Sequence, residues 1–311
     1  MEFGRIEGVD KPISRLALGS VSFTTAALPA AFELLDHFVA RGGNAVDTSY
    51  HYGQGDTDRA IGAWLVARGA RERMVIVGKG AHTYPHRPHV TPEAITDDLL
   101  RSLDGLQTDY IDLYLLHRDD PSQPVDAIVD CLNEHQAAGR IRAFGGSNWS
   151  TSRIDAANTY AHAHGLTPFV AASPNFSLAV WNEPPWAGCI AASTGEERAW
   201  YAARQFPLLS WSSQAQGFFT GRYEPDDRSR PDMARCWYNT DNFERLARAR
   251  ELAERKSSTA TAVALAYVLR QPFPTFALIG PLSTGELDSS AAALDVSLTP
   301  DELRWLNLEA D

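Results

Sequence analysis

The sequence has few cysteines, and none of them forms a motif for redox or zinc chemistry. Cys131, Cys189 and Cys236 are odd in number and widely separated, and no two of them are spaced as Cys-x-x-Cys. Dithiol exchange and cysteine-ligated zinc both need closely spaced thiols, so we expect neither, and we expect no metal site. Unpaired thiols are typical of a reducing compartment, which predicts a cytoplasmic protein.

Long apolar runs and an excess of basic residues are also missing. No stretch is long and apolar enough to span a bilayer, and Met1–Asp10 lacks the basic and apolar segments of an export signal. The formal net charge is −11, whereas nucleic-acid surfaces need clustered Lys and Arg. We therefore expect neither a membrane nor a nucleic acid as partner, and a monomer is the default expectation.

The overall composition is that of a globular chain with a sizeable core. Hydrophobic residues make up 44% and charged residues 22% of the 311 residues. This length suits two small domains or one barrel of roughly 250 residues with loop insertions. Because no linker or low-complexity segment divides the chain, we expect a single domain over residues 1–311.

Short apolar runs alternate with longer amphipathic segments along the chain. The eight candidate strands are Leu16–Val21, Ala45–Thr48, Met74–Lys79, Ile111–Leu116, Ile141–Ser147, Phe169–Ser173, Leu208–Ser212 and Thr275–Ile279. The candidate helices are Leu28–Ala40, Thr57–Arg68, Pro92–Gly105 and residues 124–138, 150–164, 195–205, 258–271 and 284–294. Eight strand–helix units favour a closed (β/α)8 TIM barrel, an α/β fold, over an open sheet.

Two stretches interrupt this alternation. Ser177–Ser193 is rich in Trp, Pro and Gly, and Gly221–Thr240 is rich in Arg, Asp and Pro. Long irregular loops of this kind are usually lids or binding loops, so we expect both at the C-terminal face of the barrel. A further amphipathic segment, Asn242–Lys256, is expected to pack outside the barrel before the seventh helix.

Four ionisable residues fall at or just after the ends of expected strands, where barrel enzymes gather their reactive groups. They are Asp47, Tyr52, Lys79 and His117. A tyrosine with a pKa near ~10 is a reluctant proton donor, but a neighbouring ammonium stabilises its deprotonated form. Lys79 suits that task, Asp47 would hold the lysine, and His117 would hydrogen-bond a carbonyl oxygen. Together they form one unit for protonating and orienting a carbonyl group.

The same residues lie in segments that resemble the aldo-keto reductase family. Asn44–Gly53 is similar to the family signature, Val77–Gly80 to its lysine strand, Asp109–His117 to its histidine strand and Gly145–Trp149 to its Gly-x-Ser-Asn segment. The similarity runs from about residue 13 to about residue 307. It implies a (β/α)8 barrel and an NAD(P)H-dependent enzyme that reversibly reduces an aldehyde or ketone, such as a sugar or aryl carbonyl, to an alcohol. Tyr52 would be its general acid and base.

The resemblance also implies a cofactor site. Ser147 and Asn148 match residues that hold the nicotinamide carboxamide, Trp211 matches an aromatic residue that stacks on the nicotinamide, and Gly217–Arg222 resembles the loop over the pyrophosphate. The full set of implied cofactor residues is Gly19, Ser147, Asn148, Ser173, Trp211, Ser212, Gly217, Arg222, Gly280, Leu282, Glu286 and Ser290.

Several of these positions depart from the family pattern. Ser173 stands where the family often has Gln, and Leu282, Glu286 and Ser290 stand where it has Arg, Gln and Asn. The missing Arg removes a partner for a 2′-phosphate, and Glu286 would repel that phosphate or bond a free ribose hydroxyl. Both NADP(H) and NAD(H) therefore remain open as the cofactor.

Residues in the expected loops are candidates for the substrate pocket. His51, Trp149 and Phe176 are assigned to it because they fall at the expected mouth of the barrel. The alternative for each aromatic residue is simple packing. His82, His86 and His89 share one Pro-containing loop with Tyr84, and we expect them to be solvated or to line the substrate site rather than to bind a metal.

Three rival functions fit parts of the sequence. Lys79 could form a Schiff base in an aldolase, but nothing else supports that chemistry. A dinucleotide-binding Rossmann fold would require Gly-x-Gly-x-x-Gly between the first strand and its helix, which is absent. The main alternative is a cofactor-binding regulatory or scaffold barrel without significant turnover. The complete Asp, Tyr, Lys and His set argues against pure binding. The sequence leaves the natural substrate and the direction of the reaction open.

Overall fold

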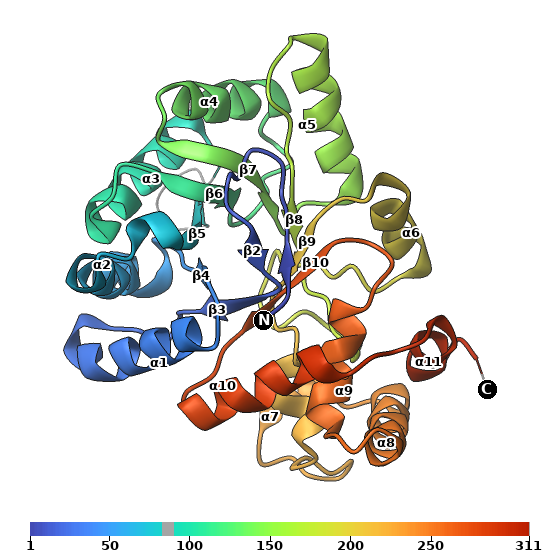
Figure 1. Cartoon of the computed structure of the whole chain (residues 1–311). Coiled ribbons are helices and arrows are strands. Elements are labelled where there is room, and N and C mark those ends of the chain that lie inside the picture. The colour runs from blue at the N-terminus through green and yellow to red at the C-terminus, as the bar shows by residue number, and fades with distance from the viewer. Residues whose placement is uncertain (83–89, 311) are drawn as a thin grey trace.

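Eight parallel strands close into one barrel in this computed structural model, which describes residues 1–82 and 90–310 (Figure 1). The strands are β3 (Leu16–Gly19), β4 (Ala45–Asp47), β5 (Val75–Gly80), β6 (Ile111–Leu116), β7 (Ile141–Ser147), β8 (Ala172–Ser173), β9 (Leu208–Ser210) and β10 (Thr275–Ile279). Each strand pairs with the next one, and β10 closes the barrel by pairing with both β9 and β3. The predicted (β/α)8 barrel is confirmed.

The strands are apolar on both faces because the barrel has two cores. Val75 and Val77 belong to an inner cluster together with Leu113 and Leu115 of the neighbouring strand. Ile76, between the two valines, packs instead with the surrounding helices. Alternate side chains of a strand point to opposite faces, so a strand buried on both sides reads as a continuous apolar run.

Helices between the strands cover the outside of the barrel (Figure 1). They are α1 (Leu28–Ala40), α2 (Asp56–Arg68), α3 (Pro92–Leu106), α4 (Val125–Ala137), α5 (Thr151–Ala163), α6 (Gly195–Arg204), α9 (Ala260–Leu269) and α10 (Thr284–Ala291). Several begin at side-chain caps: Thr91 accepts a hydrogen bond from the Ala94 amide, and Thr194 forms a capping box with Glu197. These caps satisfy amides that a helix leaves unpaired at its N-terminus.

Some predicted boundaries were wrong. Within 221–240, which was expected to be irregular, Pro231–Trp237 forms α7 and buries Met233, Cys236 and Trp237. The expected strand Phe169–Ser173 shortens to two residues, because the Asn158 side chain bonds both the amide and the carbonyl of Phe169. A short helix, α11 (Pro300–Leu306), was not predicted. The segment expected outside the barrel forms α8 (Thr240–Arg255), which runs beside α9.

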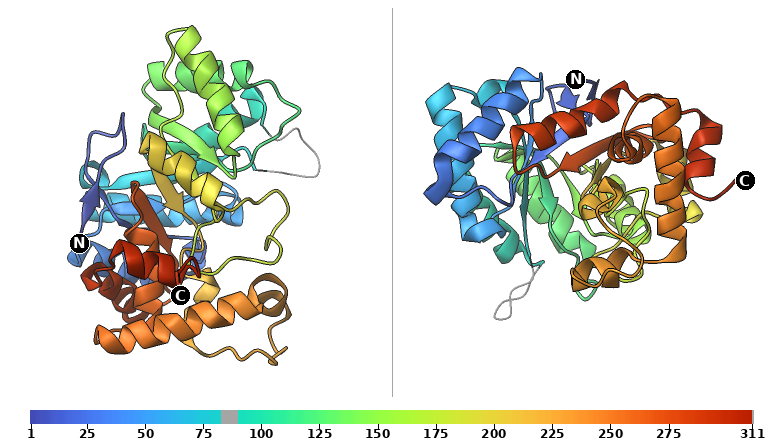
Figure 2. Two further views of the ribbon diagram at one scale, coloured as in Figure 1. Left: turned by 90° about the vertical axis from the view of Figure 1, so that its right-hand side faces the viewer. Right: turned by 90° about the horizontal axis from the view of Figure 1, so that it is seen from below.

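An N-terminal hairpin, also not predicted, closes one end of the barrel. Strands β1 (Phe3–Gly4) and β2 (Ile13–Ser14) pair antiparallel, and Ile6, Val9 and Ile13 join the inner core. The two views of Figure 2 show this hairpin at one end of the barrel and the long loops at the other. The hairpin end is therefore sealed, and the strands' C-terminal ends are left to the loops.

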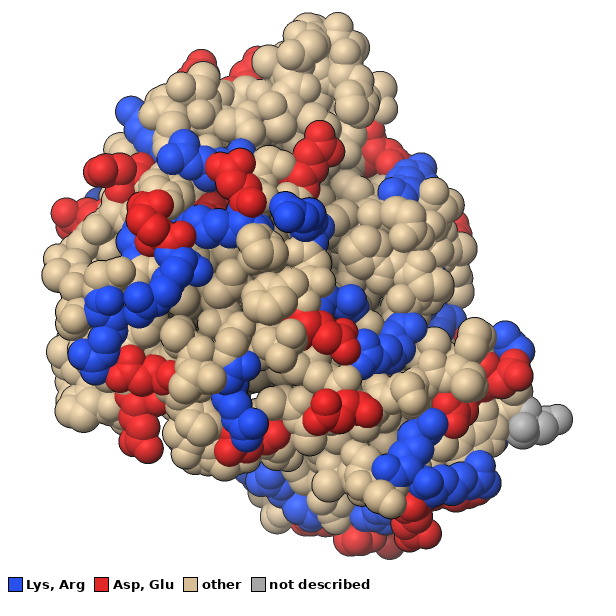
Figure 3. Space-filling model, viewed as in Figure 1, with Lys and Arg blue, Asp and Glu red and all other residues tan. Residues whose placement is uncertain are grey.

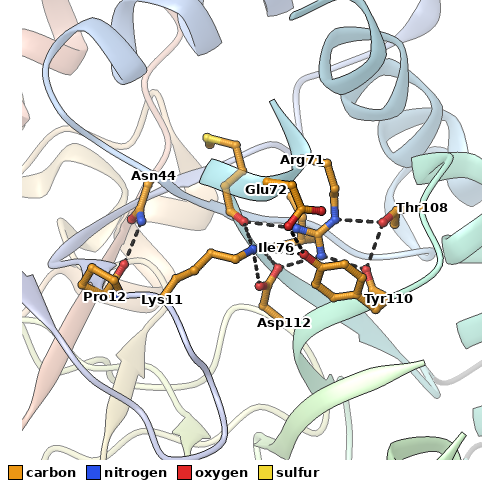
Figure 4. A network of polar contacts seen from close by, with 10 residues as sticks. Lys11, Pro12, Asn44, Arg71, Glu72, Ile76, Thr108, Tyr110 and Asp112 are labelled. Atoms are coloured by element: carbon orange, nitrogen blue, oxygen red, sulfur yellow. Dashed lines mark hydrogen bonds and ion pairs between the residues drawn. The ribbon is translucent and has the colours of Figure 1, made fainter. Parts of the chain in front are cut away.

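A polar network ties the hairpin to the barrel wall (Figure 4). The buried Asp112 of β6 forms ion pairs with Lys11 at 2.7 Å and Arg71 at 2.8 Å, and it accepts a hydrogen bond from the Ile76 amide. Arg71 also bonds Thr108 and the carbonyl oxygen of Tyr110. A buried charge needs paired and hydrogen-bonded partners, and this network supplies them to the Asp112 carboxylate.

Acidic and basic side chains alternate over the face that carries the hairpin (Figure 3). Many lie in ion pairs, such as Arg270 with Glu2 at 2.8 Å. Among the described residues, no helix is long and apolar enough to cross a membrane.

Candidate active site

The parallel direction of the strands carries the predicted residues to one end of the barrel. Asp47, Ser147 and Ser173 are the last residues of β4, β7 and β8, Lys79 is the next to last of β5, and His117, Trp211 and Gly280 directly follow β6, β9 and β10. Gly19 closes β3. Residues far apart in sequence, such as Gly19 and Gly280, thus share the end that lies opposite the hairpin.

Lys79 and Asp47 form a buried ion pair at the centre of this end. The Lys79 Nζ lies 2.5 Å from the Asp47 Oδ1 and 3.2 Å from the carbonyl oxygen of Thr48. Burial raises the pKa of Asp47 although Lys79 opposes it. Burial lowers the pKa of Lys79, but the charges of Asp47 and Tyr52 outweigh burial and raise this pKa above its usual value. The pair therefore holds a fixed ammonium beside Tyr52.

Tyr52 begins a tight turn that returns the chain to the barrel. Gly53, Gln54 and Gly55 all have positive φ, which two glycines accept without strain. The Lys79 Nζ lies 5.3 Å from the centre of the Tyr52 ring. Burial raises the pKa of the phenol, Lys79 lowers it, Asp47 raises it again, and the net shift is upward. The phenol is therefore protonated at neutral pH and can serve as an acid.

His117 stands edge-on to Tyr52, with ring centres 5.6 Å apart. Its Nδ1 lies 2.9 Å from the Ser49 hydroxyl, which also accepts a hydrogen bond from the His51 amide. Burial, followed by the charges of Lys79 and Arg118, lowers the pKa of His117 well below its usual value, so the imidazole is neutral. The Ser49 hydroxyl has a second acceptor, the Lys79 carbonyl oxygen at 3.1 Å. In the tautomer in which Ser49 donates to Nδ1 instead, the hydrogen of the His117 ring sits on Nε2, where it can bind an oxygen.

Two further imidazoles adjoin His117. His51 stacks on His82 with ring centres 3.5 Å apart, and His82 meets His117 edge-on at 4.8 Å. Burial, together with the charge of Arg118, lowers the pKa of His51. Within residues 1–82 and 90–310, no three His, Cys, Asp or Glu residues are grouped to hold a metal ion. Tyr84, His86 and His89 lie outside the described residues.

The proposed nicotinamide end contains polar atoms that lack protein partners. Ser147 Oγ donates to the Ser173 carbonyl at 2.9 Å, and Asn148 Nδ2 donates to the His117 carbonyl at 3.2 Å. In contrast, Ser173 Oγ, Asn175 Oδ1 and Trp211 Nε1 are buried without a hydrogen-bond partner in the described part of the chain. Buried polar groups are normally satisfied, so these three fit a polar ligand such as a carboxamide.

The residues assigned to the rest of the cofactor lie in the segments that follow β9 and β10 and on α10. Ser212 and Gly217 both have positive φ. Arg222 is exposed, and its Nε donates to Thr220 at 2.9 Å. Leu282 is 72% exposed, and its amide donates to the Glu286 carboxylate at 2.7 Å. Ser290 donates to the Glu286 carbonyl at 3.0 Å, one turn along the helix.

Two residues assigned to the substrate pocket lie elsewhere. Phe176 is fully buried against Tyr267 and Phe273, between the barrel and α9. Trp149 is buried against Phe169 beneath α5, and its Nε1 donates to the Arg118 carbonyl. Both side chains fill packing space, so their pocket assignment is corrected. His51 is half-buried beside the site.

Arg118, Asn175 and Ser49 were not among the residues predicted from the sequence. Arg118 directly follows His117, and a basic residue at that strand end is a signal that could have been used. Asn175 and Ser49 carry no such signal, because their roles depend on contacts with Trp211 and His117 that only the folded chain creates.

Comparisons with known proteins show what the whole chain is similar to. The model of the Aldo/keto reductase family matches residues 15–307. A norsolorinic acid reductase of Emericella nidulans is 28% identical over 310 residues, covering 94% of this chain and 76% of that protein. A probable aryl-alcohol dehydrogenase of Saccharomyces cerevisiae is 27% identical, covering 89% and 86%.

Two further matches extend the comparison. An NADP(+) aryl-alcohol dehydrogenase of Phanerodontia chrysosporium is 26% identical over 312 residues, covering 89% of this chain and 75% of that protein. The crystal structure of a thermostable aldo-keto reductase with the inhibitor epalrestat superposes with a TM-score of 0.78 at 20% identity, covering all of both chains.

Proposed function

The chain belongs to the aldo/keto reductase family of NAD(P)H-dependent oxidoreductases, and on this basis we propose that Tyr52 protonates the carbonyl oxygen during reduction. One observation carries the proposal: the half-buried Tyr52 lies beside the buried Lys79–Asp47 pair and edge-on to His117. The raised pKa of Tyr52 and the lowered pKa of His117 favour the neutral phenol and the neutral imidazole, which proton donation and hydrogen bonding to a carbonyl oxygen require.

The reaction divides between the cofactor and these side chains. When bound, the reduced nicotinamide supplies the hydride that the carbonyl carbon accepts. Tyr52 gives its phenolic proton to the oxygen, and the Lys79 ammonium stabilises the resulting phenolate. Asp47 holds Lys79 in place. His117 donates a hydrogen bond from Nε2, which orients the carbonyl group before transfer.

The orphaned polar atoms support a bound nicotinamide. Ser173, Asn175 and Trp211 would contact it, with Ser147 and Asn148 beside them. At the adenosine end, Glu286 suits a free ribose hydroxyl, whereas Arg222 is a cation that a 2′-phosphate could use. NADH and NADPH are therefore both candidates, and tryptophan fluorescence titration followed by turnover with each nucleotide decides between them.

Aryl carbonyls are the substrate class that we propose. Two of the relatives are named as aryl-alcohol dehydrogenases. In this chain Trp181 and Trp186 lie with their ring centres 5.8 and 5.9 Å from that of Trp211, and Trp186 is 55% exposed. An exposed indole beside the tryptophan assigned to the nicotinamide favours a flat, aromatic partner.

Tyr52→Phe tests the assignment directly. The variant keeps the aromatic ring but lacks the hydroxyl that donates the proton, so we expect reductase activity to fall about a thousandfold while nucleotide binding persists. Activity is followed by loss of reduced-nicotinamide absorbance with an aryl aldehyde, and binding by quenching of tryptophan fluorescence. Tyr50→Phe is the matched control, because the Tyr50 hydroxyl contacts Arg101 outside the site.

The outcome separates three cases. Full activity in Tyr52→Phe would refute the mechanism. Nucleotide binding by the native protein without turnover of any carbonyl would favour the cofactor-binding scaffold instead. Equal losses in Tyr52→Phe and Tyr50→Phe would indicate general damage to the loop.

A further inference from the structure

Arg118 is a buried cation beside the proposed reacting groups. It follows His117 at the end of β6, is only 8% exposed, and its charge contributes to the lowered pKa values of both His51 and His117. Nothing in the reaction proposed above uses it. A guanidinium buried at the mouth of a site is costly unless something pairs with it.

One edge of the Arg118 guanidinium is unused. Its Nη1 donates to the His117 carbonyl at 2.9 Å. Its Nε is buried without a partner, and no residue in the described part of the chain accepts a hydrogen bond from its Nη2. Nε and Nη2 together form the planar two-donor edge that matches the two oxygens of a carboxylate.

The same edge pairs with carboxylates elsewhere in this molecule. Arg68 bonds Asp36 with its Nε at 3.0 Å and its Nη2 at 2.8 Å. Arg41 approaches Asp288 through the same two nitrogens, at 2.8 and 2.7 Å. Arg118 differs from both because no acidic side chain of the described residues forms an ion pair with it.

The acidic neighbours of Arg118 in sequence are engaged elsewhere. Asp119 pairs with Arg153 at 3.2 Å, and Asp120 accepts hydrogen bonds from Ser122. Across from Arg118 runs the loop that contains Gly188, where φ is +71°. A Cβ at Gly188 would lie 3.5 Å from the Arg118 Cδ and 3.8 Å from its Nε. The glycine lets this loop pass close to the unused edge without placing a side chain against it.

We propose that Arg118 binds a carboxylate carried by the carbonyl substrate, so that the preferred substrates are carboxylated aldehydes or ketones. This inference rests on the proposed reductase function and adds a specificity residue to it. A single two-donor edge suits a carboxylate better than a phosphate, because the nearby cations Lys79 and Arg153 are already paired with Asp47 and Asp119.

The test compares substrates that differ only in this charge. The 2-, 3- and 4-carboxybenzaldehydes are each assayed against their methyl esters, and the ratio of kcat/KM, acid over ester, is the measured quantity. The native protein is expected to favour at least one acid. In Arg118→Met, which keeps the length of the side chain but not its charge, we expect that ratio to fall about 10- to 100-fold, as for loss of a charge-assisted hydrogen-bond pair. Arg118→Lys should restore part of it.

Arg245→Met is the matched control. Arg245 is also 8% exposed with an unpartnered Nε, but it lies on α8, outside the barrel, where it donates to Asn242. The acid-to-ester ratio should not change in this variant. A change there would mean that the ratio reports a loss of packing rather than a lost contact.

Each outcome bears on one claim. An equal fall for acids and esters in Arg118→Met would overturn the proposal, since it would place Arg118 at the reacting oxygen or in the scaffold. A native protein that prefers no acid would overturn it as well. If the native protein turns over none of the aldehydes, the proposed reductase function has failed. The role of Arg118 is then tested separately, by comparing the fluorescence quenching that 4-carboxybenzaldehyde causes in the native protein and in Arg118→Met.

Discussion

Asp58 is a buried carboxyl that takes no part in the proposed reaction. It lies in the first turn of α2 and accepts hydrogen bonds from Thr48 at 2.6 Å and Ser102 at 2.8 Å. Burial raises its pKa to about 6 despite these contacts. The residue thus links the strand that ends at Asp47 to helices α2 and α3 through neutral hydroxyls rather than through a cation.

The raised pKa of Asp58 makes stability fall as pH rises. Because the folded protein holds this proton to about 6 while the unfolded chain releases it near 3.8, its contribution is fully present below the lower value. It is lost as pH rises through about 4 to 6. Relative to Asp58→Asn, the native protein should lose about 2 to 3 kcal/mol of unfolding free energy between about pH 4 and about pH 7. Urea unfolding of both proteins at the two pH values measures this, and a difference independent of pH would contradict it.

At the scale of elements, the start of α10 decides how the proposed adenosine end is charged. Ser283 caps the helix, and Glu286 folds back so that its carboxylate accepts the Leu282 amide. The acid therefore has a local structural role, and its charge stands where the family commonly has an uncharged Gln. A 2′-phosphate placed there would meet like charge.

Glu286→Gln tests the effect of that charge on cofactor choice. Glutamine can still accept the Leu282 amide but no longer repels phosphate. We expect the ratio of kcat/KM for NADPH over NADH to rise about tenfold, a modest electrostatic effect at a partly exposed site. Asp288→Asn is the control on the same helix, because Asp288 is paired with Arg41 and His37. An unchanged ratio in Glu286→Gln would show that Glu286 does not influence the choice between NADPH and NADH.

At the scale of the whole molecule, the barrel has one end for stability and one for chemistry. The hairpin and the Asp112 network close the N-terminal end (Figures 2 and 4), and the candidate site lies at the C-terminal ends of the strands. Asp112 is the single buried carboxylate on which both Lys11 and Arg71 converge. Removing its charge leaves two partly buried cations facing each other.

Asp112→Asn should therefore destabilise the fold without altering the site. We expect a loss of about 3 kcal/mol in unfolding free energy, as for breaking a buried ion pair. Urea unfolding measures the loss, and nucleotide binding below the transition should stay at the native level. Glu251→Gln, in an exposed pair with Arg255, is the control and should change little. A native-like midpoint for Asp112→Asn would show that hairpin packing alone seals the barrel.

Local pattern was sufficient for the architecture. The apolar runs at Val75–Gly80 and Ile111–Leu116 and the helix start at Pro92 could be predicted because strand burial and helix capping are short-range properties. Once the strands are parallel, Asp47, Lys79 and His117 must emerge at the same end, so the residues of the candidate site could also be named in advance.

By itself, then, the sequence determined the barrel, its family and the set of residues at its C-terminal end. Only the tertiary structure decided that Trp149 and Phe176 are packing residues, that His51 stacks on His82, and that Arg118 keeps an unused edge. These features depend on contacts between distant segments, such as Arg118 with the loop that contains Gly188. The spacing of residues along the sequence does not encode such contacts, because the burial and pairing of a side chain depend on which distant residues become its neighbours in the folded protein.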